Sequence, residues 1–355
     1  MIARSETDAV KAAGARYRDA TRNVAMLRDV ESLAGAHVCV AGFTGQVGSG
    51  LVRVLAEANR TALAANPMQI TGIARRARNT VPAGVNAIYA DVADPNGPFS
   101  PARFTHVFYA AGVTSDYRSR PGDVIASQLV GLEAFLERAD PDCRFVFVSS
   151  ARVYGRHVED EALAEDSTAV VAPMHLDDLY DSAKRLAESL CLSHAERHDL
   201  NVTVVRPGNL YGLDSPHSAT SISELVREAA TTRRITLTGN PSSLRNYCCV
   251  VDLVQGLLLA ATRGRPGRAY NIGSNEHLAT HELAQEIAGC FGTPIEIVGP
   301  PSPTAPTYQR LSLDRATREL GYAPQLSIRD VLPAVAAETA AQLAAHGIAL
   351  QVQLA

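Results

Sequence analysis

The sequence predicts an α/β fold with a doubly wound parallel sheet and a smaller C-terminal lobe. From Ala36 onward, short apolar runs alternate with helical segments, the pattern of a parallel sheet covered by helices on both faces. The first apolar run is followed by glycines spaced G-x-x-G-x-x-G and then by a helical segment, as in a dinucleotide-binding β-α-β unit. A chain of 355 residues with 46% hydrophobic content is large enough for a second lobe. These observations together predict a Rossmann-type fold.

Composition and charge argue against several other classes of protein. The formal net charge is -4 and basic residues are scattered among acidic ones, so nothing favours nucleic-acid binding. Residues 1–31 lack the apolar core of a secretory signal, and no run of about 20 apolar residues offers a membrane span. The six cysteines form no CxxC pair and have no histidine at metal-ligand spacing. We therefore expect a cytoplasmic protein with reduced, buried thiols and no metal site.

The individual elements follow from the length and periodicity of each apolar segment. Residues 1–34 have helical spacing and are expected to form an N-terminal helical extension ahead of the first strand. The expected strands are His37–Ala41, Gln69–Ala74, Ala87–Ala90, His106–Ala110, Arg144–Ser149 and Asn201–Arg206. The expected helices among them are Val47–Ala58, Pro121–Arg138 and Leu179–His198.

The glycine-rich turn after the first strand predicts a site for the pyrophosphate of a dinucleotide. Glycines let the backbone turn tightly and let a pyrophosphate approach the amides at the helix N-terminus, where the helix dipole favours negative charge. The alternative is an ordinary tight turn, but its position in a β-α-β unit favours cofactor binding. The residues expected to contact the cofactor here are Gly42, Thr44, Gly45, Gln46, Val47 and Gly48.

Two arginines follow the second strand, where NAD-binding proteins usually have a carboxylate for the ribose 2′-hydroxyl. Arg75 and Arg76 could instead hold a 2′-phosphate in bidentate fashion. We therefore expect NADP or NAD as the cofactor, with NADP favoured. The alternative is a pair of solvated loop arginines.

The chain divides where the β-α alternation loosens, after Pro207. Residues 35–207, with returns near 245–275, are expected to form the NAD(P)-binding Rossmann domain. Residues 208–244 and 276–345 contain helices and proline-rich loops, and we expect them to form the substrate-binding lobe.

A tyrosine and a lysine lie four residues apart in the expected helix Leu179–His198. Tyr180 and Lys184 therefore project from one helix face. A tyrosine is a poor base at its ordinary pKa of about 10, and a neighbouring ammonium favours the phenolate that hydride chemistry on an alcohol requires. Ser150, at the end of a strand, is the candidate hydroxyl facing the cofactor. A lone Y-x-x-x-K usually marks a surface helix, but here it follows the glycine-rich turn and the Ser-Ser strand end in order.

The ordered set of motifs resembles the extended short-chain dehydrogenase/reductase family of nucleotide-sugar epimerases, dehydratases and reductases. The resemblance covers about Ala36 to Leu332. The matching motifs are Gly42-Phe43-Thr44-Gly45-Gln46-Val47-Gly48, Tyr89-Ala90-Asp91-Val92, Ala110-Ala111-Gly112, Ser149-Ser150-Ala151-Arg152-Val153-Tyr154-Gly155, the Tyr180/Lys184 pair, Arg206-Pro207-Gly208-Asn209-Leu210-Tyr211-Gly212, Arg245 ahead of Val250-Val251-Asp252, Tyr270-Asn271-Ile272-Gly273 and Leu320-Gly321-Tyr322-Ala323-Pro324.

The resemblance implies roles for particular positions. Ser150, Tyr180 and Lys184 would form the catalytic triad. Further cofactor contacts would come from Asp91, Val92, Ala110, Ala111, Gly112, Ser149, Tyr180, Lys184 and Pro207. Substrate contacts would come from Ser150, Ala151, Arg152, Asn209 and Arg245. Asn209 and Arg245 would hold the substrate diphosphate, whereas a turn residue and a surface charge are their alternative roles.

Departures from the family pattern narrow the function that the resemblance implies. Family dehydratases resemble one another in an Asp-Glu pair just after the catalytic hydroxyl, whereas this chain has Ala151 and Arg152. Without a carboxylate to move a proton at C5 or C6, 4,6-dehydration and the related decarboxylation are disfavoured. Gln128 replaces the usual Asn in the helix under the cofactor. The segment from Gly72 to Arg76 resembles that of NADP-using GDP-mannose dehydratases.

Two enzyme hypotheses and one non-catalytic hypothesis remain. We expect a nucleotide-sugar epimerase that oxidises and re-reduces sugar C4, with Tyr180 as acid and base and a nucleotide-diphosphate sugar as its substrate partner. The alternative is an NADPH-dependent reductase of a nucleotide-linked 4-ketosugar, which would use the same residues. A non-catalytic dinucleotide-binding module is a third hypothesis, which the presence of the complete triad disfavours.

The resemblance also implies a homodimer. Two helices of each subunit, Pro121–Arg138 and Leu179–His198, would pair into a four-helix interface. The candidate interface residues are Val124, Leu132, Leu186 and Leu190. Ordinary core packing is the alternative role of each.

Overall fold

The computed structural model describes residues 24, 27–77, 81–94, 96–97, 103–113, 118, 120–171, 178–212, 221–300 and 304–354. Most of the helical extension expected over residues 1–34 therefore lies outside the described residues. Its described end contains a short 3₁₀ helix, η2 (Val30–Leu33), whose Val30 and Leu33 are buried in the main core.

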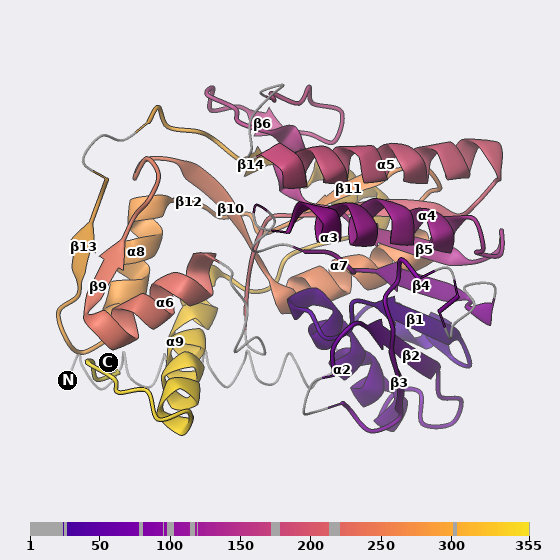
Figure 1. Ribbon diagram of the computed structural model, residues 1–355, viewed down its shortest axis with the longest axis horizontal. Helices are drawn as coiled ribbons and strands as arrows, with labels where there is room; N and C mark the ends of the chain where they lie inside the picture. Colours follow the sequence, from indigo (N-terminus) through magenta and orange to yellow (C-terminus); the bar gives the residue numbers. More distant parts are fainter. Residues whose placement is uncertain are drawn as a thin grey trace.

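A seven-stranded parallel sheet forms the centre of the larger body (Figure 1). In spatial order, its strands are β11 (Ala269–Ile272), β7 (Val202–Pro207), β5 (Arg144–Val148), β4 (His106–Tyr109), β1 (His37–Ala41), β2 (Gln69–Ala74) and β3 (Val85–Tyr89). The strand order reverses between β1 and β4, and ligands of doubly wound sheets bind at the carboxyl ends of the strands at such a point. The predicted doubly wound parallel fold is confirmed.

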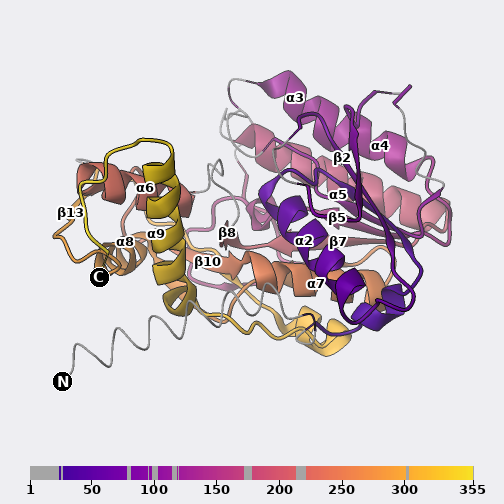
Figure 2. The same ribbon diagram turned by 90° about the horizontal axis from the view of Figure 1, so that it is seen from below.

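Helices cover both faces of this sheet (Figures 1 and 2). On one face, α2 (Gln46–Arg60) and α7 (Val250–Arg263) pack together over an apolar core. On the other face lie α5 (Leu179–Arg197) and a helix that runs from Pro121 to Leu136. The latter was predicted as one regular helix, but its middle is a π-helical segment, η4 (Ala126–Val130), between α3 (Pro121–Ile125) and α4 (Gly131–Leu136).

A second, smaller group of elements has its own apolar cluster beside the main sheet (Figure 1). A three-stranded sheet consists of β12 (His277–Ala279), β10 (Leu244–Cys249) and β8 (Asn209–Tyr211). Helices α6 (Ser221–Thr232), α8 (Thr280–Gly289) and α9 (Ile328–Ala345) pack around that cluster. The short pairs β9 (Arg234–Thr236) with β13 (Glu296–Val298), and β6 (Ala162–Leu163) with β14 (Arg310–Leu311), complete the strands.

Residues 245–275, expected to return to the main domain, are divided between the two bodies. Strand β10 pairs with β8 and β12, whereas helix α7 packs on the main sheet and β11 joins that sheet beside β7. All six cysteines are buried and none is in a disulfide, as predicted. Within the described residues, none of the helices is long and apolar enough to cross a membrane.

Candidate active site

The glycine-rich turn joins β1 to the N-terminus of α2. Gly42 has a φ of 84° and its amide donates to the carbonyl of Ile73, while the amide of Gly45 donates to the carbonyl of Gly42. A Cβ on Gly42 would lie 2.7 Å from the backbone of Ala110, and one on Gly48 would lie 2.3 Å from the carbonyl oxygen of Gly42. Because these glycines carry no side chain, the turn stays tight and a ligand can approach its backbone closely at the start of a 15-residue helix. This arrangement fits the pyrophosphate of a dinucleotide.

Replacing Gly48 with alanine is expected to destabilise the protein by about 1–3 kcal/mol because the new methyl group collides with backbone. The Gly48→Ala variant should also lose dinucleotide affinity, since relief of the collision must move the turn. The matched control is Gly122→Ala, because a Cβ there meets nothing within 4 Å. Chemical denaturation and dinucleotide titration of both variants check the prediction, and a fully stable, dinucleotide-binding Gly48→Ala protein would contradict it.

The residues predicted for the adenosine end lie at the β2–β3 side of the turn. The Nη1 atom of Arg75 lies 3.3 Å from a carboxylate oxygen of Asp123 and 3.9 Å from one of Asp91. Arg76 is exposed, and Val92 is buried in the core. Arg75 is thus already held between two carboxylates, while Arg76 faces solvent.

A cavity of about 360 Å³ lies at the carboxyl ends of the central strands. It brings the glycine-rich turn together with the predicted catalytic residues, which lie far away in the sequence. Its described lining is Gln46, Val47, Ala110, Gly112, Val148, Ser149, Ser150, Ala151, Arg152, Tyr180, Lys184, Pro207, Gly208, Asn209, Leu210 and Gln309. Thr44 and Ala111, which were also predicted to contact the cofactor, are not part of this lining.

Lys184 lies beneath Tyr180 and is almost completely buried. Its Nζ donates to the carbonyl of Val148 at 2.7 Å and lies 5.9 Å from the ring centroid of Tyr180. Burial lowers the pKa of Lys184 to about 8, although the negative charge of Glu188 partly opposes this effect. The ammonium is therefore fixed under the phenol ring, where it can favour the phenolate.

Ser150 begins the 3₁₀ helix η5 (Ala151–Tyr154), and its hydroxyl accepts a hydrogen bond from the amide of Arg152. The guanidinium of Arg152 has its Nε 2.7 Å from Oδ1 of Asp181 and its Cζ 5.3 Å from the Tyr180 ring centroid. Arg152, a predicted substrate residue, therefore contacts Ser150 through its backbone amide and lies near the ring of Tyr180 with its guanidinium.

A second cavity, of about 550 Å³, lies within the smaller body, among α6, α8, β8 and β10, and contains Arg245. Asn209 lines both cavities, which places them next to each other. Arg245 donates to the carbonyl of Leu244 and to the carbonyl and hydroxyl of Thr307. Burial lowers the pKa of Arg245, and the charge of Arg152 lowers it further.

No carboxylate among the described residues forms an ion pair with Arg245, so an anionic ligand is the expected counter-charge. Thr307 orients Arg245 and Gln309 orients Asn209 by hydrogen bonds. Neither Thr307 nor Gln309 was predicted from the sequence. Both come from a proline-rich stretch that carries no periodic signal.

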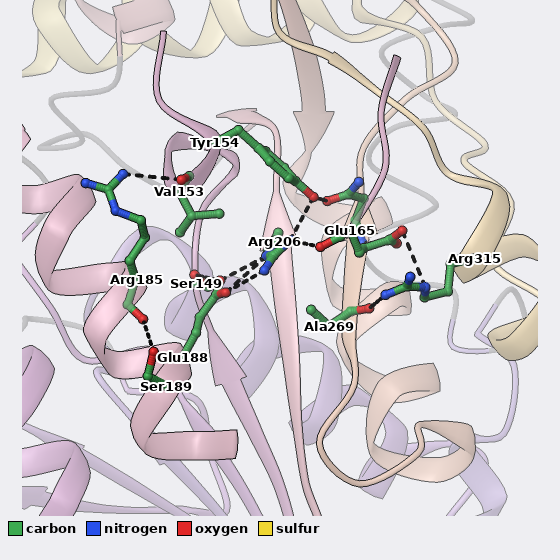
Figure 3. A network of polar contacts seen from close by, with 11 residues as sticks. Ser149, Val153, Tyr154, Glu165, Arg185, Glu188, Ser189, Arg206, Ala269 and Arg315 are labelled. Carbon is green, nitrogen blue, oxygen red and sulfur yellow. Dashed lines mark hydrogen bonds and ion pairs between the residues drawn. The ribbon is translucent and has the colours of Figure 1, made fainter. Parts of the chain in front are cut away.

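A buried polar network connects α5 with the ends of β5 and β7 (Figure 3). The Ser149 hydroxyl donates to Glu188, and the guanidinium of Arg206 binds Glu188 through Nε and Nη2, at 2.6 Å for Nη2. Arg206 also donates to the hydroxyl of Tyr154 and to the carbonyl of Glu165. The network ties the ends of β5 and β7 to α5. Glu188 and Arg206, which form its centre, were not predicted from the sequence.

Gln128 is completely buried in η4, beneath the segment after β4 that contains Gly112. Its Nε2 donates to the carbonyl of Val113, and its side chain lies directly under Gly112. Glutamine thus lies under Gly112, where the family pattern has asparagine, and it belongs to the π-helical segment η4.

A glycine-lined helix N-terminus next to a Ser-Tyr-Lys cluster, on a doubly wound sheet, defines the class of the chain. It is an enzyme of the extended short-chain dehydrogenase/reductase class, which uses a nicotinamide dinucleotide. Residues 38–273 match the model of the NAD dependent epimerase/dehydratase family, and the chain belongs to that family.

Individual relatives agree with this assignment. The dTDP-glucose 4,6-dehydratase of Streptomyces antibioticus is 29% identical over 307 residues, which cover 81% of this chain and 88% of that protein. The structure of MoeE5 with UDP-glucose and NAD has a TM-score of 0.71 at 22% identity and covers 86% of this chain and 99% of MoeE5. UDP-glucuronic acid 4-epimerase from Bacillus cereus, with UDP-glucuronic acid and NAD, has a TM-score of 0.69 at 18% identity, with coverages of 86% and 99%.

Proposed function

We propose that the protein is a nucleotide-sugar 4-epimerase. The observation that carries this proposal is the composition of the catalytic cavity: none of the described residues that line it is acidic. Dehydration and decarboxylation need an acid or base for C5 or C6, and Ala151 and Arg152 occupy the positions where family dehydratases have theirs. Epimerisation at C4 needs only the tyrosine, the lysine and the serine.

In this mechanism Tyr180 takes the proton of the C4 hydroxyl and later returns it. Lys184 stabilises the phenolate, and Ser150 holds the sugar oxygen by a hydrogen bond. The bound dinucleotide supplies the chemistry of hydride acceptance and return at C4. The cavity walls exclude water from the ketosugar while it turns its other face, and Asn209 and Arg245 hold the diphosphate throughout. We propose residues 208–244 and 276–345 as the substrate-binding lobe.

The dinucleotide retained by the purified protein provides the first test. We expect denaturation to release about one nicotinamide dinucleotide per chain, because an epimerase recycles its hydride internally. A protein that is empty but binds added NADPH, and reduces a nucleotide-linked 4-ketosugar, would replace this proposal with the ketoreductase. A protein that binds neither dinucleotide would leave only a non-enzymatic role, against the family assignment.

We propose NADP as the preferred dinucleotide, on the basis of Arg75 and Arg76 at the end of β2. The double variant Arg75→Ala/Arg76→Ala is expected to lose at least about tenfold in NADP affinity, as for one or two charge-assisted hydrogen bonds, with little change for NAD. Arg60→Ala, an exposed arginine at the end of α2, is the matched control. Titrations with both dinucleotides check the prediction, and an unchanged NADP-to-NAD ratio would mean that the two arginines are ordinary loop residues.

We also propose a homodimer through the helices Pro121–Leu136 and α5, with an interface that shares only Leu186 with the four predicted residues. Val124 and Leu132 are fully buried in the core of their own chain, and Leu190 is partly buried. The large apolar side chains exposed on α3, η4 and α5 are Ile125, Val130, Leu186 and Leu192. Of the four predicted residues, Leu186 is the one available to a partner.

Leu186→Asp is expected to shift the protein from dimer to monomer, because it places a charge in the apolar interface. The matched control is Val158→Asp, an exposed apolar residue away from these helices. Sedimentation velocity measures the masses. A wild-type monomer, or a Leu186→Asp variant that remains a dimer, would show that these helices do not form the interface.

A further inference from the structure

The catalytic cavity contains one charge that the epimerase mechanism does not use, the guanidinium of Arg152. Arg152 is two residues after Ser150, lines the cavity, and has a side chain that is 38% exposed. Its Cζ is 5.3 Å from the ring centroid of Tyr180. A sugar whose C4 hydroxyl reaches Tyr180 would therefore place the substituents of a neighbouring carbon close to Arg152.

The guanidinium is held in place from the protein side. Asp181 follows Tyr180 on α5, is 5% exposed, and binds Nε of Arg152 through Oδ1. Burial raises the pKa of Asp181, and the charge of Arg152 opposes that effect. The ion pair fixes Arg152 against the catalytic helix, so that little side-chain entropy is lost when the guanidinium binds a ligand.

The other positively charged side chains described near the cavity make contacts that assign them other roles. Lys184 lies beneath the phenol ring, and Arg245 lies next to Asn209 in the neighbouring cavity, where a diphosphate would bind. Arg206 is engaged in the network with Glu188, Tyr154 and Glu165 (Figure 3). Arg152 is near enough to Arg245 to lower the pKa of Arg245, so the two guanidinium groups lie in adjoining parts of one site.

Building on the proposed epimerase function, we propose that Arg152 binds a carboxylate at C6 of the sugar and that the substrate is a nucleotide-activated uronic acid. The planar guanidinium matches a carboxylate in geometry and charge. The position is suitable because, in the family dehydratases that this chain resembles, the corresponding positions carry the acids that act at C5 and C6. Asp181 then serves as a positioning residue, and Arg152 determines specificity.

The test compares hexose and uronate forms of the same nucleotide. UDP-glucose with UDP-glucuronic acid, and the corresponding dTDP and GDP pairs, are supplied to the purified holoenzyme. Epimer formation is followed by chromatography, and binding by calorimetry. We expect the uronate to be favoured, and Arg152→Met to lower the uronate-to-hexose ratio about 10- to 100-fold, as for loss of a charge-assisted hydrogen bond. Arg152→Lys should lose less, and Arg156→Met, in the adjacent loop, should leave the ratio unchanged.

The ratio within each variant cancels general losses of folding or activity. Because Arg152→Met leaves Asp181 without its ion pair, Arg152→Met/Asp181→Asn is measured alongside it and should show the same ratio. A wild-type enzyme that epimerises the hexose as well as the uronate overturns the uronate proposal and leaves the epimerase standing. An uronate preference in binding with no epimer formed supports Arg152 and overturns the epimerase, whereas no binding in any pair overturns both.

Discussion

Replacement of Tyr180 by phenylalanine is expected to lower epimerisation about 10²- to 10⁴-fold, the range for loss of a general acid–base group. Phenylalanine keeps the ring that packs between Arg152 and Lys184 and removes only the hydroxyl that exchanges the proton. The amount of bound dinucleotide and the denaturation midpoint should therefore remain those of the wild type. Epimer formation and the absorbance of reduced nicotinamide, measured on the same sample, check this expectation.

The control for this variant is Tyr89→Phe. Tyr89 is 45% exposed at the end of β3, away from the catalytic cavity, and its replacement should leave turnover unchanged. The expected loss for an acid–base residue would be contradicted if Tyr180→Phe kept more than about a tenth of wild-type activity. That result would mean that another group moves the proton. If the Tyr180→Phe variant forms no epimer but keeps the protein's biological activity, the protein would instead be a non-catalytic dinucleotide-binding module.

The main sheet could be predicted from the sequence because its signals are local. The central parallel strands are largely buried on both faces and appear as short apolar runs, as at His37–Ala41 and Gln69–Ala74, both of which the structure places with the predicted bounds. The same local signal could not assign β10 to one sheet or the other. Its run Tyr247–Cys249 is as apolar as a strand of the main sheet, and only its partners β8 and β12 distinguish it.

The catalytic cavity was predictable where a motif keeps its residues at fixed spacing. Tyr180 and Lys184 are one helical turn apart, and Ser150 follows the end of β5, so their meeting follows from the fold. Thr307 and Gln309 reach Arg245 and Asn209 across a separation of 62 and 100 residues, which no local pattern reveals. Helical spacing alone also could not show that Val124 and Leu132 face the core of their own chain.

Arg206→Met is expected to destabilise the protein by about 3–5 kcal/mol, the cost of leaving a buried charge without its partner. The side chains of Arg206 and Glu188 are each 13% exposed, and Nη2 lies 2.6 Å from the carboxylate. Burial alone would lower the pKa of Arg206, but its hydrogen bonds with Glu188 raise that pKa on balance. Urea denaturation measures the loss. Arg310→Met, which removes an exposed pair with Asp160, is the control and should cost at most about 1 kcal/mol.

A second variant separates the charge from the shape of the network. Arg206→Met/Glu188→Leu removes both charges and should regain much of the lost stability, because an apolar pair of similar volume often replaces a buried ion pair at little cost. The epimerase activity of this double variant should nevertheless remain below that of the wild type. Glu188 also accepts a hydrogen bond from the hydroxyl of Ser149, next to Ser150, and the double variant loses this bond. Recovery of both stability and turnover would show that the network only holds α5 against the sheet. Recovery of stability without recovery of turnover would show that the network also positions Ser149 and Ser150 after β5.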